Sequence, residues 1–260
     1  MIFDLFKKIY KIVYSLLAIL IFLLIWEITA RSGAVNPTFL PPFSKVALAF
    51  WNLAITGTLF KHLFVSLQRA VFGFAVGLAI AVPLGLLIGW YKGFEGFIDP
   101  LLQTFRQTSA LSLFPVFILL FGIGETSKVA IIFWGVQWPI LLSTIAGVRS
   151  VEPLLIKSAH SMGASTITLF RKVIIPGAFP SIFTGIRLSA TYSILILIAA
   201  EMIGSNAGLG FLLYTAETTF QIPEMYAAIV TMSLLGLALN YLLLGIGTRI
   251  IRWKEDLPLS

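Results

Sequence analysis

Long apolar runs, separated by short polar and basic segments, dominate this chain. The runs predict about six membrane-spanning helices, near residues 12–29, 65–91, 103–122, 127–148, 179–203 and 225–250. Each run is close to the ~20 residues that cross the hydrocarbon core of a bilayer at ~1.5 Å per residue. Arg187 interrupts the fifth run near one end, where a long side chain can reach the lipid headgroups.

Helix-breaking residues follow the first run. Asn36-Pro37 and Pro41-Pro42 end it, and the pattern of Phe43–Trp51 predicts a short amphipathic helix at the outer interface. A polar and basic stretch at 149–176 separates the fourth run from the fifth. We therefore expect an all-α polytopic membrane protein, with a single transmembrane domain over residues 1–260 and one long cytoplasmic loop at 149–176.

Composition and charge support this class. Hydrophobic residues make up 58% of the chain and charged residues 11%, whereas soluble domains have about 25% charged residues. The segments expected in the cytoplasm hold Lys7, Lys8, Lys11, Lys92, Arg149, Lys157, Arg171, Lys172, Arg249, Arg252 and Lys254, and the opposite segments hold only Arg31, Lys45, Lys61, Arg69 and Lys128. By the positive-inside rule both termini face the cytoplasm. This bias accounts for the net charge of +7, so no nucleic-acid partner is expected.

The N-terminal run has a second interpretation. Its basic start and the small residues Ser32-Gly33-Ala34 partly fit a signal peptide, but its removal would leave five spans with the termini on opposite sides, so we favour retention. The chain has no cysteine, which excludes disulfides and thiolate metal sites. His62 and His160 lie in segments expected on opposite sides of the membrane. Neither a metal site nor a catalytic constellation is therefore expected.

The loop at 149–176 predicts two short helical elements. Glu152-Pro153 suits a helix start, and the helix is expected to end near Gly163. The segment TITLFRKVIIP then leads to Pro176. Two short elements joined by a turn of small residues predict a compact knob at the inner surface.

This loop resembles the EAA signature of the permease subunits of bacterial ABC importers, which is Glu-Ala-Ala, three residues, Gly, nine residues and Ile-x-Leu-Pro. Lys157-Ser158-Ala159, Gly163 and Val173-Ile174-Ile175-Pro176 reproduce every spacing. Lys157 and Ser158 replace the leading Glu and the first Ala. Other fragments resemble the branch that handles nitrate, bicarbonate, sulfonate and taurine: Phe121-Gly122-Ile123-Gly124-Glu125, Pro176-Gly177-Ala178-Phe179-Pro180, Gly185-Ile186-Arg187-Leu188, Ala200-Glu201-Met202-Ile203-Gly204 and Gly208-Leu209-Gly210-Phe211.

The resemblance implies a permease in the bacterial inner membrane that works as a homodimer, with two ATPase subunits below and an extracytoplasmic binding protein above. ATPase coupling is then expected at Lys157, Ser158, Ala159, His160, Gly163, Ala164 and Pro176. The chain has no G-x-x-x-x-G-K-[ST] loop, so it is not expected to be an enzyme, and ATP and Mg would be bound by the partner. The implied cargo is a small oxyanion. Thiamine precursors, riboflavin and aromatic acids remain alternatives within the same role.

Residues at membrane depth are the candidates for the pathway: Arg106, Gln107, Ser109, Phe114 and Glu201. Where prolines are common in this branch the chain has Gln107-Thr108-Ser109-Ala110, so either the helix starts earlier here or these polar groups line the pathway. The spacing of Phe114, Phe117 and Phe121 fits a packed helix face or, as the minority view, a hydrophobic gate.

Glu201 is expected near the outer mouth, either bonded to helix ends or serving a gate. A secondary transporter or channel would need ion-coupling carboxylates or a selectivity filter at mid-membrane. No acidic residue lies inside the second, third, fourth or sixth run, so we do not favour that class.

Overall fold

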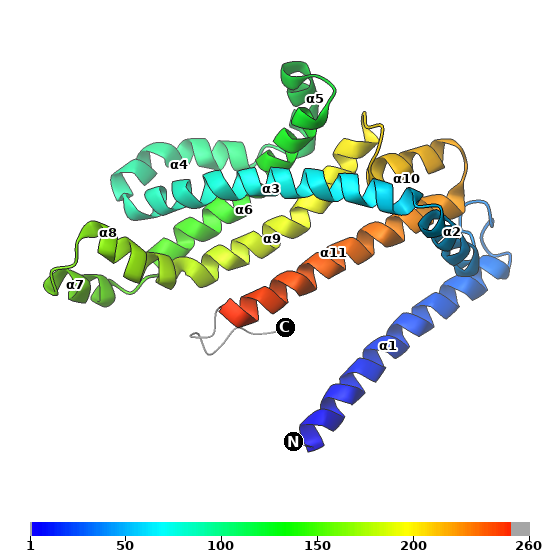
Figure 1. Ribbon diagram of the computed structural model, residues 1–260, viewed down its shortest axis with the longest axis horizontal. Coiled ribbons are helices and arrows are strands. Elements are labelled where there is room, and N and C mark those ends of the chain that lie inside the picture. The colour runs from blue at the N-terminus through cyan, green and yellow to red at the C-terminus, as the bar shows by residue number, and fades with distance from the viewer. Residues whose placement is uncertain (1, 251–260) are drawn as a thin grey trace. The chain divides into compact units, whose positions relative to one another are not determined.

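The computed structural model describes the chain from residue 2 to residue 250, and all regular secondary structure in this part is helical, which confirms the all-α class (Figure 1). The basic residues Arg252 and Lys254 lie outside the described residues, as do the side chains of Lys7, Lys8 and Lys11. The helices are α1 Ile2–Arg31, α2 Phe43–Ile55, α3 Thr58–Trp90, α4 Lys92–Arg106, α5 Ala110–Phe121, α6 Glu125–Arg149, α7 Pro153–Ser161, α8 Thr166–Leu169, the π-helical turn η1 Phe170–Ile174, α9 Ile175–Met202, α10 Leu209–Thr218 and α11 Ile222–Ile250.

Four of these helical segments are long and apolar enough to cross a membrane: α3, α6, the continuous segment Thr166–Met202, and α11. The bent pair α4 and α5 counts as a fifth. Helix α1 has 30 residues and covers the predicted first span. The chain forms two compact units, one of residues 1–61 and 212–231, the other of residues 62–211 and 232–260, and each is described by itself.

The first unit is organised around the start of α2. Pro42 precedes this helix, and the Glu27 carboxylate of α1 accepts hydrogen bonds from the backbone N–H of Ser44 at 3.0 Å and from its hydroxyl at 2.9 Å. A carboxylate at a helix N-terminus satisfies free N–H groups there and is stabilised by the helix dipole. Val46 and Ala49 pack into a core with Ala227, whereas the opposite face of α2 is exposed. The amphipathic helix predicted at 43–51 is confirmed and extends to Ile55.

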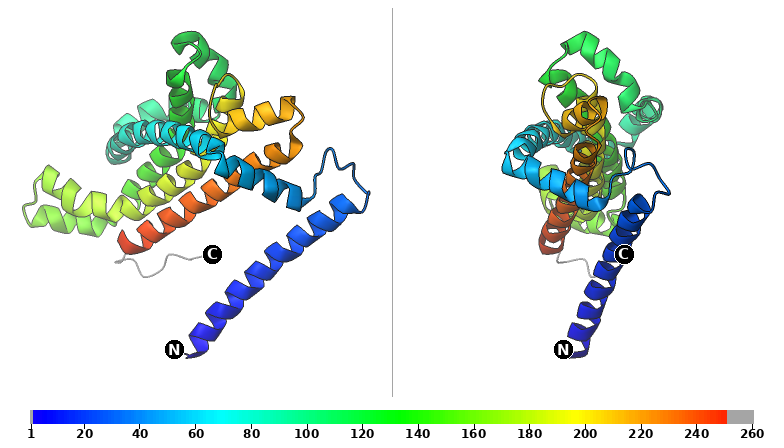
Figure 2. Two further views of the ribbon diagram at one scale, coloured as in Figure 1. Left: turned by 45° about the vertical axis from the view of Figure 1, so that its right-hand side comes forward. Right: turned by 90° about the vertical axis from the view of Figure 1, so that its right-hand side faces the viewer.

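In the second unit α3, α6 and α9 run side by side, with α7 and α8 at one end of the α6–α9 pair (Figures 1 and 2). Helix α3 carries a small residue at every fourth position: Gly73, Gly77, Ala81, Gly85 and Gly89. A Cβ added to Gly73 would lie 2.6 Å from Ile132, and one added to Gly85 would lie 2.6 Å from Thr144, both on α6. Small residues of this spacing let two membrane helices approach until their backbones nearly touch.

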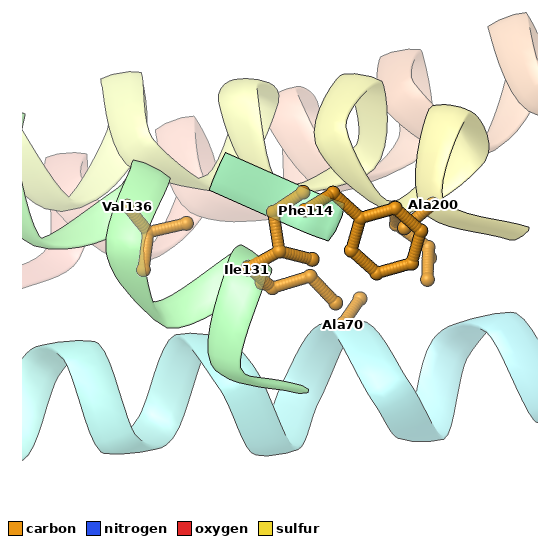
Figure 3. Packing of buried hydrophobic residues seen from close by; sticks show 7 residues of the cluster. Ala70, Phe114, Ile131, Val136 and Ala200 are labelled. Carbon is orange, nitrogen blue, oxygen red and sulfur yellow. The ribbon is translucent and has the colours of Figure 1, made fainter. Parts of the chain in front are cut away.

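A core cluster lies where α3, α5, α6 and α9 meet. Figure 3 shows Phe114 of α5 pointing among Ala70, Ile131 and Ala200, and its side chain is 2% exposed. Phe117 packs against the same cluster from the outside. Phe114 therefore packs in the core. Of the two roles that the spacing suggested, a packed helix face and a hydrophobic gate, its burial favours the first.

Valine at Gly85 is expected to destabilise the fold, because its side chain would overlap Thr144 and overpacking costs about 1–3 kcal/mol. Gly96→Val is the matched control, since nothing lies within 4 Å of a Cβ added there. Thermal unfolding in detergent should show a lower midpoint for Gly85→Val only. Equal midpoints for the two variants would contradict the close α3–α6 contact.

The third predicted span differs from expectation. Instead of one helix over 103–122, α4 ends at Arg106 and α5 begins at Ala110, with a bend of 94° between them. Ser109 has extended backbone angles, φ −61° and ψ 128°, and precedes α5 at the N-cap position that serine favours. The alternative in which the helix starts earlier is therefore wrong. The break falls on the polar residues that replace the prolines.

The second element of the 149–176 loop is continuous with the fifth span, which was expected to start at 179. The N–H of Ile175 bonds to the carbonyl of Phe170, five residues back, so the helix widens into a π-helical turn at this point. Pro176 follows and has no N–H to donate. A π-bulge at a proline keeps a helix continuous where a normal hydrogen bond is missing.

Candidate functional site

The loop between α6 and α9 has a well-defined turn. Helix α7 has Pro153 at its first position and ends at Ser161. The N–H of Gly163 bonds to the carbonyl of His160, and that of Ala164 bonds to Ala159, both at 3.0 Å. Together with φ +74° at Gly163 this is a Schellman motif, in which glycine is the residue with the lowest steric cost. Ser165 then starts α8 by accepting a hydrogen bond from the N–H of Thr168.

The loop has an inner and an outer face. Ile156 and Ala159 pack against a cluster of buried residues from α6, α8 and α9 that includes Leu169 and Ile174. On the outer side Met162 is 86% exposed and Ile167 is 80% exposed.

The expected coupling residues divide between these faces. Lys157, Ser158, His160 and Gly163 are exposed, whereas Ala159, Ala164 and Pro176 are half-buried. Ala159, one of the residues expected at the ATPase contact, packs against the core of its own loop. Its small side chain lets α7 lie close to α8 and η1.

An ion pair supports the base of this loop. Arg149, the last residue of α6, pairs with Glu95 on α4. The loop is therefore fixed to α6 and α9 by apolar packing, and the end of α6 is fixed to α4 by charge.

A cluster of polar and charged side chains lies at the other end of α9, and all of them except Glu125 are buried. We call Ser66, Arg69, Glu125, Lys128 and Glu201 the Glu201 cluster. The Glu201 side chain is fully buried. Its carboxylate accepts hydrogen bonds from Arg69 Nη1, from the Ser66 hydroxyl and from the N–H of Gly210, at 2.8–2.9 Å. The carboxylate thus joins α3, α9 and the start of α10.

Arg69 connects this carboxylate to a second one. Its Nε and Nη2 donate to the two oxygens of Glu125 at 2.5 and 2.6 Å, a bidentate arrangement, and Nη1 also donates to the carbonyl of Ala207. Lys128 Nζ lies 3.6 Å from Glu125. Two cations and two carboxylates therefore balance in this cluster, and charge-assisted pairs of this geometry are the stronger hydrogen bonds in proteins.

The turn after α9 is shaped to fit the cluster. Gly208 has φ +122°, and a Cβ at this position would overlap the Glu201 carboxylate. The N–H of Gly208 donates to Nδ1 of His62, and that of Leu209 donates to the Ser66 hydroxyl. His62 therefore has a structural partner in this turn.

A pocket of about 580 Å³ opens beside the Glu201 cluster. Arg69, Glu125 and Lys128 line it, together with Ile123, Gly204 and Asn206 from the neighbouring turns. Sequence reasoning named only Glu201 here. It missed Ser66 and Arg69 as partners of Glu201, and it missed the Glu125–Lys128 pair beside them. The sequence did contain a signal for the pair: Arg69 lies near the start of one apolar run, and Glu201 lies near the end of another.

The remaining pathway candidates separate in space. Arg106, Gln107 and Ser109 lie together at the α4–α5 break and line one pocket of about 390 Å³. Phe114 lies in the core and Glu201 in its cluster, so neither lines this pocket. Trp134, Trp138 and Tyr192 also line it, and none of these was predicted as a pathway residue.

No three His, Asp or Glu side chains are placed to hold a metal ion together within residues 2–250. The Glu201 carboxylate is held by Arg69, Ser66 and the N–H of Gly210. The chemistry of these groups is ion pairing and hydrogen bonding between helices.

Comparison with known proteins gives consistent results. Residues 81–255 match the family described as binding-protein-dependent transport system inner membrane component. A Bacillus subtilis (strain 168) protein, assigned by name to aliphatic sulfonates transport as a permease, is 32% identical over 96% of this chain and 91% of its own length. The bicarbonate transport system permease protein of Synechococcus elongatus is 31% identical over 90% of this chain and 87% of its own.

The fold is also similar to a solved structure. A chain of the MetNI methionine ABC transporter, in an inward-facing conformation, superimposes with a TM-score of 0.65 over 76% of this chain and 97% of its own length. The two are 18% identical.

Proposed function

Because this chain belongs to the family of binding-protein-dependent transport system inner membrane components, we propose that it forms the path by which a small oxyanion enters the cell, driven by a partner ATPase. The observation that carries this proposal is the rigid knob of α7 and α8. Its exposed side chains Leu154, Met162 and Ile167 form a surface for a soluble subunit, and its inner face is packed onto α6 and α9.

The partners follow from this role. Two ATPase subunits would bind ATP and Mg and dock on the α7 knobs of two copies of this chain. An extracytoplasmic binding protein would deliver the cargo at the opposite end, where the Glu201 cluster lies. In this arrangement Lys157, Ser158 and His160 contact the ATPase, and Ala159, Ala164 and Pro176 hold the knob in shape.

The cargo is proposed to be an oxyanion such as a sulfonate, taurine, nitrate or bicarbonate. Relatives named for aliphatic sulfonates and for bicarbonate support this class. Glu201 supports it indirectly, because its charge is fully used by protein partners and does not repel an anion.

Reconstitution tests the proposal. The chain is co-expressed with its ATPase subunit, purified and placed in vesicles with the binding protein, and uptake of labelled taurine and bicarbonate is followed. We expect uptake that requires both ATP and the binding protein. Uptake driven by an ion gradient without the ATPase would instead identify a secondary transporter.

Orientation gives a separate prediction. A cysteine at Ser161, in the knob, should be protected from an impermeant thiol reagent in intact cells, whereas one at Thr218 should react, because the basic residues place the knob in the cytoplasm. Both positions are exposed, and the chain has no native cysteine. Labelling of Ser161→Cys from outside would show that the chain has the opposite orientation in the membrane.

A further inference from the structure

The pocket at the α4–α5 break has the chemistry of a binding site for an organic anion. Its only charged lining residue is Arg106, at the end of α4, and no acidic side chain lines it. Gln107 and Ser109 add polar groups beside the guanidinium, and both are exposed. Glu95 and Asp99 line a separate pocket on the other side of Arg106. On the side of the α4–α5 break the guanidinium has only neutral polar groups beside it, which favours a negatively charged ligand.

The opposite wall is apolar and aromatic. Trp134 and Trp138 have ring centroids 5.4 Å apart at 79°, and Ile196 and Pro139 line the same pocket. Phe105 and Phe117, which do not line the pocket, make ring contacts with Trp134. A ligand that fills the pocket therefore needs an apolar body as well as a charged head.

Size separates organic from inorganic anions. The volume of about 390 Å³ is in the range of small-molecule sites, roughly 300–1,000 Å³. At ~30 Å³ for each water, this equals about thirteen water molecules. An anion of three or four heavy atoms would leave most of the pocket unfilled and the tryptophan wall without contact.

Two unpaired donors strengthen the case. The indole N–H groups of Trp134 and Trp138 are buried and have no hydrogen-bond partner among the described residues. Burying a donor without a hydrogen-bond partner costs free energy, and a hydrogen bond to an acceptor recovers that cost. Both groups are covered in this state, so a turn of either ring is needed to present its N–H to an oxygen in the pocket.

From these features we infer that the pocket is a transient binding site on the transport path for an organic oxyanion with a short aliphatic body, such as an alkanesulfonate. Arg106 pairs with the oxyanion, Ser109 donates to it, and Trp138 contacts the aliphatic part. This inference rests on the proposed function and narrows its cargo: the pocket favours organic sulfonates over bicarbonate and nitrate.

The test measures binding to the purified permease–ATPase complex in lipid nanodiscs, without the binding protein. The probes are methane-, ethane- and butanesulfonate, with bicarbonate, nitrate and butylammonium as comparisons. Affinity should rise about three- to fourfold with each methylene. Arg106→Gln should weaken butanesulfonate binding by at least about tenfold. Lys92→Gln is the matched control, because it removes one charge from an exposed position on the same helix outside the pocket.

The outcomes separate the possibilities. Equal binding to Arg106→Gln and Lys92→Gln, or no dependence on chain length in the native complex, would overturn the inference. If Arg106→Gln fails to fold, the chain-length series decides alone, and Trp138→Ala should flatten it. ATP-driven uptake without a chain-length preference would contradict the proposed sulfonate site and leave the permease function supported. Normal sulfonate binding without any ATP-driven uptake would overturn the permease function instead.

Discussion

Replacing Arg69 by leucine is expected to lower the free energy of unfolding by about 3–5 kcal/mol, because the change leaves the buried Glu201 carboxylate without its cation. Glu125 would lose its bidentate partner at the same time. Thermal unfolding of the purified chain in detergent measures the effect. Arg187→Leu, the same substitution in a spanning helix, is the control, since none of the ion pairs described for residues 2–250 involves Arg187.

A double variant makes this prediction specific. Arg69→Leu combined with Glu201→Leu removes both buried charges, so it should be more stable than Arg69→Leu alone. If the double variant loses, relative to the native chain, the full sum of the two single-variant losses, the two side chains do not act as a pair. Glu201→Gln should fold and alter the coupling of ATP hydrolysis to uptake, with no change in the preferred substrate.

The second large effect is expected at Gly163. Gly163→Arg should abolish co-purification of the ATPase and reduce ATP-driven uptake by at least about tenfold, because a long charged side chain would stand on the surface proposed for docking. The variant should still insert in the membrane, since nothing lies within 4 Å of a Cβ at this position.

Gly163→Ala is the matched control for backbone strain. Both variants put an L-residue at φ +74°, which costs about 1–2 kcal/mol, but only arginine adds bulk. Normal ATPase binding and uptake by Gly163→Arg would exclude the knob as the docking surface. An equal loss of ATPase binding and uptake in both variants would show that these depend on the geometry of the turn and not on contact with its surface.

Much of the fold could be predicted because each span is a local feature. Uncharged runs and the helix breakers at Pro41-Pro42 are visible in sequence. The pattern of Phe43–Trp51 predicted a helix, which in the structure extends to Ile55. The small-residue period of α3 was also visible but was not used. It could have identified α3 and α6 as neighbours, because only one helix face carries Gly73, Gly77, Gly85 and Gly89.

The break after Arg106 was harder to predict. The residues there have moderate helix propensity, and Pro115 lies inside α5 without ending it. Here the bend is set by packing of Leu102 on one side and Phe114 on the other, which are contacts to other helices. Such tertiary contacts outweigh local preference, so sequence alone suggested a straight helix.

Part of the candidate site could be predicted for the same reason. The α7 loop is local, and its glycine and spacing point to the turn that the structure contains. The Glu201 cluster joins residues that are 132 positions apart, and the Trp134–Trp138 wall faces a pocket formed by a different helix pair. These combinations depend on topology, which the residue pattern does not specify.

The Glu201 cluster also constrains how the protein is made. Arg69 is synthesised 56 residues before Glu125 and 132 residues before Glu201. At about 5–20 residues per second, its first carboxylate arrives after roughly 3–11 s and its second after roughly 7–26 s. During the first interval Arg69 has neither of these partners. Glu125 arrives first and is the earlier of the two carboxylates that can pair with the guanidinium, a pairing that the folded chain keeps. The cluster is complete only when the chain has been translated past Gly210.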